Sequence, residues 1–274
     1  MVDLKNIDFV RLFKTGGKIL IAAVVLVVLL LLFGGPAEDA GASRFEQLLG
    51  RGVLRAGVSE DMPKLGLYTN GSVQGMEADL ARHIAKDIFG EGSEPMLLPY
   101  NEQTRQYALD NGEADLLICR LSKADVPEDT YIFSDPYFID AVSFMARDGD
   151  TMTLEDLNGK KVACIYNASA QDEFVSEVKK RGLTLQVVEY ASYPEAVEAL
   201  QKGAVDAFAE HTLVLSKYLK SGYTMSADRF APQELCVAAL PGDEEPMQCV
   251  QETLRALEQS GQMGALRKKW GLLG

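Results

Sequence analysis

The chain has 274 residues, 47% hydrophobic and 24% charged, a globular composition that excludes general disorder. Its formal net charge of −13 argues against nucleic-acid binding, because an acidic surface repels a phosphate backbone. Four cysteines are too few for a disulfide-built scaffold, and only two histidines, His83 and His211, are present as ligands for a histidine metal site. We therefore expect no metal and no cofactor, in one large domain or two small ones.

The N-terminal region sets the expected compartment. Residues 19–33 are all apolar, Lys14 and Lys18 precede them, and Gly34, Gly35 and Pro36 end the run. A basic flank before such a run predicts a cytoplasmic N-terminus and an exported body. The run is either a membrane anchor, which we favour, or a cleaved signal sequence, since 15 residues are short for a span. The predicted parts are a cytoplasmic segment (1–18), an anchor or signal (19–35) and a tether (36–51).

From residue 52 onward, strand-like and helix-like segments alternate, as in an α/β fold with a mostly parallel sheet. Apolar runs predict the strands, and apolar residues four apart predict the helices. In the first half the strands are 52–58, 94–100 and 114–119, and the helices are 76–89 and 101–111. In the second half the strands are 160–165, 183–190 and 205–209, and the helices are 169–181 and 192–202, capped by Ser169 and Ser192.

The two halves share a register. Adding 91 to the numbers of the first half places Gly112 on Gly203 and Asp115 on Asp206, each before an apolar strand. The Gly-x-x-Asp pair at matching places indicates two similar lobes with a cleft between them. The alternative is that the two motifs arose independently and only mark the passage from a helix to a strand.

Polar residues that follow the strands are the candidates for binding, because ligands of parallel sheets lie beyond the carboxyl ends of the strands. Arg120 is the expected partner of an anionic group, and the helix start at Ser169 offers free N–H groups for an anion. His211 is either a general base or a polar contact. The ligand-binding candidates are Asp61, Tyr100, Arg120, Ser122, Asn167, Ser169, Glu210 and His211.

The four cysteines have no metal-like spacing. Cys119, Cys164 and Cys236 lie in strand-like runs and Cys249 on a helical pattern, so buried free thiols are expected. A Cys236–Cys249 disulfide is the alternative.

Seven segments in order resemble the family 3 extracellular solute-binding proteins, the amino-acid receptors of ABC importers with the type II periplasmic-binding-protein fold. They are GVLRAGVSEDMP (52–63), GMEADLARHIA (75–85), GEADLLICRLS (112–122), FSDPYF (133–138), LEDLNGKKVACIYNAS (154–169), GAVDAFAEH (203–211) and LRALEQSGQMGALRKKWG (254–271). The resemblance covers about residues 50–274. It implies an α/β fold whose two lobes are joined by two crossover strands near 141–144 and 230–235 and close around a small ligand. Lobe one would comprise 52–141 and 235–274, and lobe two 142–234.

The chain departs from the family at the amino-acid clamp. The resemblance implies an arginine for the ligand α-carboxylate where Pro127 stands, and an aspartate for the α-amino group where His211 follows Glu210. Arg120 replaces a usual glycine, whereas the carboxylate-binding hydroxyl remains as Ser122. One possibility is that Arg120 replaces the missing arginine while Glu210 or Asp61 binds the cationic group of the ligand. The other is that the ligand is not an α-amino acid.

The expected function is capture of a small polar solute, an amino acid or a related compound, outside the cytoplasm. Closure of the lobes would present the solute to the permease of an ABC importer, and the N-terminal segment would hold the protein to the membrane. No enzymatic activity is expected. Two alternatives stay open: a dehydratase-type enzyme, in which Glu210, Asp61 and His211 supply acid chemistry, and a ligand-free interaction or sensor module.

Overall fold

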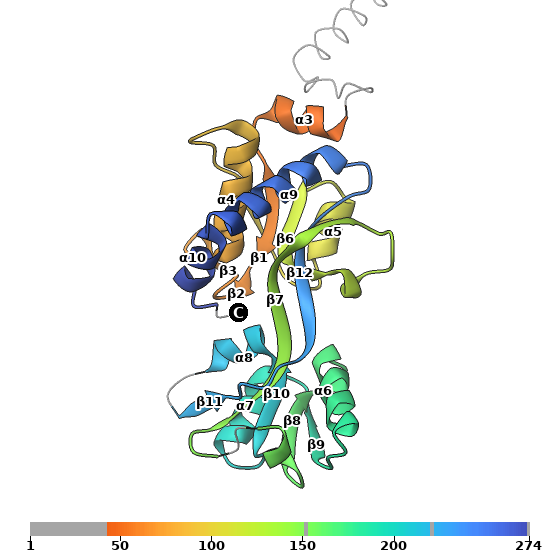
Figure 1. Ribbon diagram of the computed structural model, residues 1–274, viewed down its shortest axis with the longest axis vertical. Coiled ribbons are helices and arrows are strands. Elements are labelled where there is room, and N and C mark those ends of the chain that lie inside the picture. Colours follow the sequence, from red (N-terminus) through yellow and green to blue (C-terminus); the bar gives the residue numbers. More distant parts are fainter. Residues whose placement is uncertain (1–42, 151–152, 220–221, 273–274) are drawn as a thin grey trace, which may run out of the picture. The chain divides into compact units, whose positions relative to one another are not determined.

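The computed structural model describes residues 43–150, 153–219 and 222–272 (Figure 1). The predicted cytoplasmic segment and anchor lie outside these residues, as does the first part of the predicted tether, residues 36–42. In the part of the chain that is described, no helix has both the length and the apolar character needed to cross a membrane.

The end of the predicted tether is helical. Residues 44–51 form α3 (Arg44–Arg51), whose Leu48 is only 2% exposed. Arg44 lies 3.4 Å from the Asp243 carboxylate across 199 residues of sequence. These contacts make α3 part of the compact unit Arg44–Gly274.

Among the described residues, nine strands form one mixed sheet in the order β5-β1-β6-β12-β7-β10-β8-β9, and β11 also pairs with β7. Their bounds are β1 (Arg55–Ser59), β5 (Met96–Tyr100), β6 (Leu116–Ser122), β7 (Ile132–Arg147), β8 (Lys161–Ile165), β9 (Gln186–Tyr190), β10 (Ala207–His211), β11 (Tyr223–Met225) and β12 (Phe230–Ala239). A small antiparallel sheet contains β2 (Asp61–Met62), β3 (Gly66–Thr69) and β4 (Ser72–Gln74). The helices are α4 (Met76–Phe89), α5 (Arg105–Asp110), α6 (Ser169–Lys180), α7 (Tyr193–Gln201), α8 (Thr212–Tyr218), α9 (Glu244–Gln259) and α10 (Gln262–Lys269).

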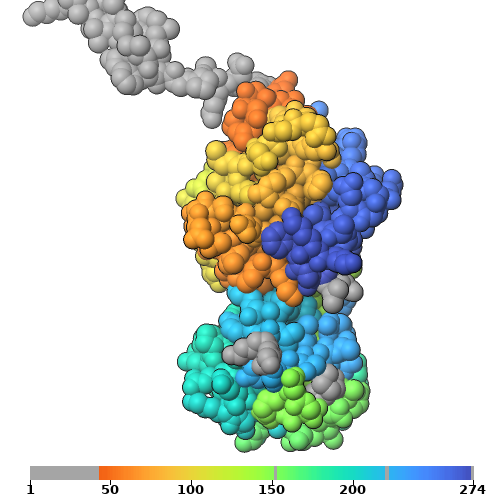
Figure 2. Space-filling view, turned by 90° about the vertical axis from the view of Figure 1, so that its left-hand side faces the viewer, coloured from red at the N-terminus to blue at the C-terminus, as the bar shows by residue number. Residues whose placement is uncertain are grey.

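The large sheet contains two parallel three-stranded blocks. Strands β5, β1 and β6 form the block of lobe one, and β9, β8 and β10 form the block of lobe two. The antiparallel strands β7 and β12 run side by side between the blocks (Figure 1). Figure 2 shows one lobe built from the orange, yellow and dark blue segments, so the two ends of the described chain share a lobe. The predicted fold class, two βαβ lobes joined by two crossover strands, is confirmed.

Each sheet block is covered on both faces, as its alternating side chains show. In β6, Leu116 and Ile118 pack with α4 and α9, whereas Leu117 and Leu121 pack with α5. In lobe two, Cys164 of β8 packs with α6, and the preceding residue Ala163 packs with α7. Because strand side chains alternate between faces, these apolar runs bury both of their sides.

The shared register of the two halves has a structural cause. The carboxylates of Asp115 and Asp206 each accept the backbone N–H that opens the first strand of their lobe, at Arg55 and Lys161, both at 2.8 Å. In return the N–H of each aspartate donates to the carbonyl of the same strand residue. The Gly-x-x-Asp pair therefore joins a helix end to a strand start, and it is not a ligand site.

One of the two predicted helix caps is wrong, because the N-cap residue of α6 is Ala168 rather than Ser169. Ser192 is the N-cap residue of α7 as predicted, although its side chain makes no capping bond. The Ser169 hydroxyl lies 3.5 Å from His211 Nε2, so it is turned away from the free N–H groups of its own helix. Asn101 does accept bonds from the N–H groups of Gln103 and Thr104, but α5 begins only at Arg105.

All four cysteines are free thiols, as expected. The alternative Cys236–Cys249 disulfide is not formed.

Candidate functional site

A cavity of about 540 Å³ lies where the two lobes and the crossover strands meet. Lobe one contributes Glu102, Gln103, Arg105, Gln106, Arg120 and Asp125, lobe two contributes Ile165, Tyr166, Asn167, Ala168, Ser169, Tyr193, Glu210 and His211, and the crossover strands contribute Asp140 and Gln233. Its volume falls in the range of roughly 300–1,000 Å³ that is usual for small-molecule sites. A smaller cavity of about 120 Å³ adjoins it and shares Arg105, Arg120 and Tyr193.

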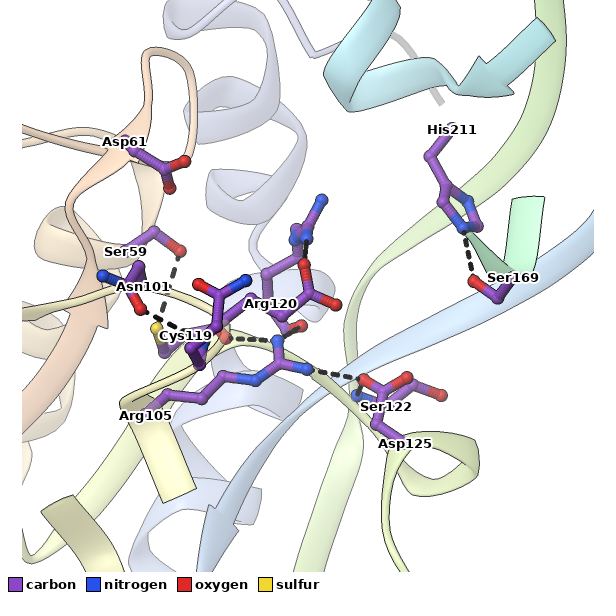
Figure 3. Close-up of polar contacts among 12 residues, drawn as sticks. Ser59, Asp61, Asn101, Arg105, Cys119, Arg120, Ser122, Asp125, Ser169 and His211 are labelled. Carbon is purple, nitrogen blue, oxygen red and sulfur yellow. Dashed lines mark hydrogen bonds and ion pairs between the residues drawn. The ribbon is translucent and has the colours of Figure 1, made fainter. Parts of the chain in front are cut away.

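The structure brings five of the eight predicted residues together around the larger cavity: Arg120, Asn167, Ser169, Glu210 and His211. Ser169 and His211 lie on one side and Arg120 on the other (Figure 3). Asp61 and Tyr100 line the smaller cavity instead.

The three predicted residues that do not line the larger cavity each have a partner within the protein. The Ser122 hydroxyl lines neither cavity and accepts the Ala124 N–H, capping a 3-10 turn at 123–125. The Tyr100 hydroxyl donates to Glu113 at 2.7 Å. The Asp61 carboxylate lies 3.5 Å from Lys217 Nζ of α8, an ion pair between the lobes.

Arg120 sits at the end of β6 in a left-handed conformation, with φ of 47°. This conformation is strained for a residue with a Cβ atom. The Arg120 N–H donates to Glu77 at 2.9 Å, and its guanidinium donates to Glu102 at 2.8 Å. Burial alone would lower the pKa of Arg120, but Glu102 and other nearby anionic groups raise it above its usual value. Arg120 is therefore a cation that is already paired.

Sequence reasoning missed Glu77, which lines neither cavity but holds the backbone of residues that do. This fully buried carboxylate accepts the N–H groups of Ser59 at 2.8 Å and Arg120 at 2.9 Å, and the Tyr137 hydroxyl at 2.8 Å. Burial raises the pKa of Glu77, and these hydrogen bonds offset part of the rise. Glu77 thus joins the ends of β1 and β6 to β7. The signal was an acidic residue at a buried position of the predicted helix 76–89.

Sequence reasoning also missed Arg105, which is 3% exposed. Its guanidinium donates to the Cys119 carbonyl at 3.0 Å, to the Arg120 carbonyl, and to the Asp125 carboxylate at 3.1 Å. Arg105 therefore positions the backbone on which the Arg120 side chain is mounted (Figure 3). Nothing in the pattern of the predicted helix 101–111 distinguished an inward-facing arginine from a solvated one.

On the lobe-two side, the ionisable side chains Glu210 and His211 each keep a buried polar atom without a hydrogen-bond partner among the described residues. Glu210 is 2% exposed; its Oε1 accepts the His211 N–H at 2.9 Å, and its Oε2 has no hydrogen-bond partner among the described residues. Burial raises the pKa of Glu210 to about 7, although the His211 N–H and Arg120 lower it in part. His211 Nδ1 also lacks a partner within the described residues, and burial lowers the pKa of His211.

Asp140, also missed, lies at the back of the cavity in the middle of β7. It is 2% exposed, and its Oδ1 accepts the Ala141 N–H at 2.8 Å and the Thr212 hydroxyl at 2.6 Å. These donors are neutral, and Arg120, with which Asp140 interacts electrostatically, is already paired with Glu102. In the described ranges, no group of three or more acidic, histidine or cysteine side chains is arranged to hold a metal ion.

Comparison of the sequence with models of known protein families identifies the family of this chain. The profile of the bacterial extracellular solute-binding proteins, family 3, matches residues 54–273, which is most of the chain. The chain belongs to this family.

Relatives and solved structures agree with that membership. The amino-acid-binding protein AabA of Dichelobacter nodosus is 28% identical over 217 residues, 77% of this chain and 84% of that protein. An ancestral arginine-binding protein solved with arginine bound is 26% identical, with a TM-score of 0.59, covering 80% of this chain and 98% of that one. An ancestral cationic amino acid solute-binding protein has the same fold, with a TM-score of 0.69 at 24% identity, covering 83% and 99%.

The resemblance places the amino-acid clamp at Pro127 and His211, and only one of these two positions lies at the larger cavity. Pro127 lines neither cavity, and its carbonyl accepts the Thr130 hydroxyl at 2.7 Å in a turn. His211 does line the larger cavity, beside Glu210. The loop that contains Pro127 therefore contributes no arginine or lysine to the lining of the cavity.

Proposed function

We propose that this chain captures a small polar solute, an amino acid or a related compound, in the 540 Å³ cavity and delivers it to the permease of an ABC importer. The observation that carries the proposal is the placement of charge. A guanidinium lies on the lobe-one side and a carboxylate without a cationic partner lies on the lobe-two side, at Arg120 and Glu210. A solute that carries both an anionic and a cationic group would complement both sides, and it would be held by both lobes at once.

The predicted residues then have distinct roles. Arg120 uses one nitrogen for Glu102 and keeps further N–H groups for an anionic group of the solute. Asn167 and Ser169, at the start of the 12-residue helix α6, approach it from lobe two. Glu210 and His211 bind the cationic part. Asp61 and Tyr100 border the smaller cavity and Ser122 supports the loop next to Asp125, so these three act indirectly.

The compartment follows from the family, whose members are described as extracellular. We propose that residues 19–35 tether the protein to the outer face of the membrane, as their apolar run and basic flank indicate. We also keep the lobe boundaries proposed from the sequence, at 141/142 and 234/235, which fall within β7 and β12.

We propose further that the cavity binds without catalysis. A dehydratase needs its acidic groups on one substrate, but Asp61 borders the smaller cavity and pairs with Lys217, whereas Glu210 and His211 line the larger one. A ligand-free interaction module is disfavoured for a different reason. Its cleft would be sealed, whereas this cavity of about 540 Å³ is large enough for a small molecule.

Thermal melting of the full-length protein tests the proposal. The panel holds the common amino acids, small carboxylates, polyamines and prephenate-like acids. A ligand present at 100 times its Kd adds about 2.7 kcal/mol to the free energy of unfolding, which shifts the melting midpoint visibly. We expect a shift with at least one amino acid or amine. No shift with any compound would contradict solute capture, and turnover of a prephenate-like acid would contradict binding without catalysis.

A further inference from the structure

We infer that the solute is a net cation, and that its protonated amine or guanidinium group binds Glu210 and Asp140 at the back of the larger cavity. This inference rests on the proposed function and names the solute class of the same site. It does not require the solute to carry a carboxylate.

The first step is the balance of charge in the cavity. Four carboxylates line it, at Glu102, Asp125, Asp140 and Glu210, against two guanidinium groups. Both guanidinium groups are used within lobe one, where Arg120 pairs with Glu102 at 2.8 Å and the second arginine pairs with Asp125 at 3.1 Å. Two carboxylates therefore remain without a cation, and a positively charged solute restores the balance.

The second step is the state of the two remaining carboxylates. Both are 2% exposed and belong to neighbouring antiparallel strands, β10 and β7, which pair at Glu210 and Ser143. The Glu210 Oε2 atom has no donor among the described residues, and the donors to Asp140 are neutral. A buried carboxylate without a cationic partner is costly, and an ammonium or guanidinium group supplies both a charge and several N–H groups.

The third step is what the cavity offers to an anion. Arg105 directs its guanidinium to two backbone carbonyls and Asp125, and its one unpaired atom, Nε, is buried from solvent. Arg120 is shared with Glu102. A solute carboxylate would therefore bind an arginine whose charge Glu102 already offsets, and it would lie near two carboxylates that have no cationic partner. The gain from an anionic group is smaller than the gain from a cationic one.

The surroundings favour a cation as well. Tyr166 is 61% exposed at the cavity wall, and Tyr193 also lines the cavity, so both rings are accessible to a solute cation. Glu173 of α6 has an unpaired Oε2 among the described residues and adds negative potential near Asp140.

The test is calorimetric titration of the full-length protein with matched solutes. L-arginine and L-lysine carry a carboxylate, and their decarboxylated counterparts, agmatine and cadaverine, do not. L-glutamine and L-glutamate are the neutral and anionic controls. We expect at least one of the four cations to bind at least 100-fold more tightly than either control. The comparison of arginine with agmatine, and of lysine with cadaverine, then shows whether the solute is an amino acid or a simple amine.

Two outcomes would overturn the inference and are distinguishable from failure of the proposed function. If glutamine or glutamate binds as tightly as the best cation, capture of a solute stands but the assignment of a net cation is wrong. If none of the four cations binds, the inference is also wrong, and the wider melting panel decides whether any solute is captured.

A matched pair of variants locates the contact. Glu210→Gln keeps the shape of the side chain and removes its charge, so we expect at least a tenfold loss of affinity for the best cation. Glu198→Gln, on α7 and paired with Lys202 at the surface, removes the same charge from lobe two and should leave affinity within twofold. Equal affinities of the wild type and a folded Glu210→Gln variant would overturn the assignment of Glu210.

Discussion

The two lobes contribute opposite kinds of wall to the same cavity. On the lobe-one side, Arg105 and Arg120 are each paired with a carboxylate, and Glu77 fixes the backbone beneath them. On the other side, Glu210 and His211 are buried as deeply but keep unpaired atoms. The paired wall is preorganised before any solute arrives, whereas the unpaired wall is completed only by the solute. A binding site of this kind costs stability in the empty protein and regains it on binding.

The largest expected effect tests the paired wall. Replacing Arg105 by Met removes a buried cation, so two carbonyls and Asp125 lose their donor. We expect the free energy of unfolding to fall by about 3 kcal/mol, measured by urea denaturation. Arg82→Met, at a half-exposed ion pair of α4, is the control and should cost less than about 1 kcal/mol. Equal losses in the two variants would show that Arg105 does not hold the wall together.

The next effect tests the unpaired wall and has the opposite sign. The pKa of Glu210 is raised to about 7 in the folded protein, so the ionised group destabilises the fold once the pH rises above its ordinary value near 4.5. Glu210→Gln should therefore stabilise the solute-free protein at pH 8, by up to roughly 3 kcal/mol. The gain should shrink as the pH falls and vanish only well below pH 4.5, where Glu210 is protonated in both the folded and the unfolded state. A variant that is less stable than the wild type at pH 8 would contradict an unpaired buried carboxylate.

The third effect sharpens the same comparison through binding. A cationic solute prefers ionised Glu210, and a pKa of about 7 leaves the ionised fraction about tenfold smaller at pH 6 than at pH 8. We expect the affinity to fall about tenfold over that range, measured by calorimetry.

The groups that face Glu210 set the control for this profile. Arg120 stays cationic, and burial lowers the pKa of His211, which keeps its ring neutral. The other titratable neighbours that act on Glu210 or are affected by it are Glu102, Asp140, Cys164 and Tyr193. In Glu210→Gln the profile should become flat. A tenfold slope that persists in this variant would assign the titration to one of these neighbours.

The smallest effect concerns the backbone of the paired wall. Arg120→Gly and Arg120→Ala both remove the guanidinium, but only alanine keeps a Cβ atom at a φ of 47°. The glycine variant should be more stable than the alanine variant by about 1 kcal/mol, measured by thermal melting. An alanine variant as stable as the glycine variant would show that the left-handed conformation is relaxed when the arginine is absent.

The sequence was sufficient for the fold because periodicity and strand punctuation are local signals. The helix predicted over 76–89 is found at the same bounds, and the Gly-x-x-Asp pairs mark equivalent junctions in the two lobes. The long strands β7 and β12 were less visible, since their central residues serve both lobes and follow no single alternation of burial.

The site was only partly predictable, for a similar reason. Glu210 and His211 could be found because they end a strand at the edge where ligands bind. Arg105, Glu77 and Asp140 belong to a helix or a strand, and only tertiary packing shows that Arg105 and Asp140 line the cavity and that Glu77 holds the backbone of Arg120. Which charges are already paired also depends on contacts between distant segments, such as Arg120 with Glu102 and Lys217 with Asp61.

The central claim is that the solute brings a cation to the unpaired carboxylate of Glu210. Counting the protons released on binding tests it most directly, by calorimetry of the full-length protein with the best cation of the matched set, at pH 7 in phosphate and in Tris. Because the pKa of Glu210 is about 7 in the empty site, binding should release about half a proton per solute, and none in Glu210→Gln. Binding without proton release in the wild type, or with the same release in the variant, would contradict the account.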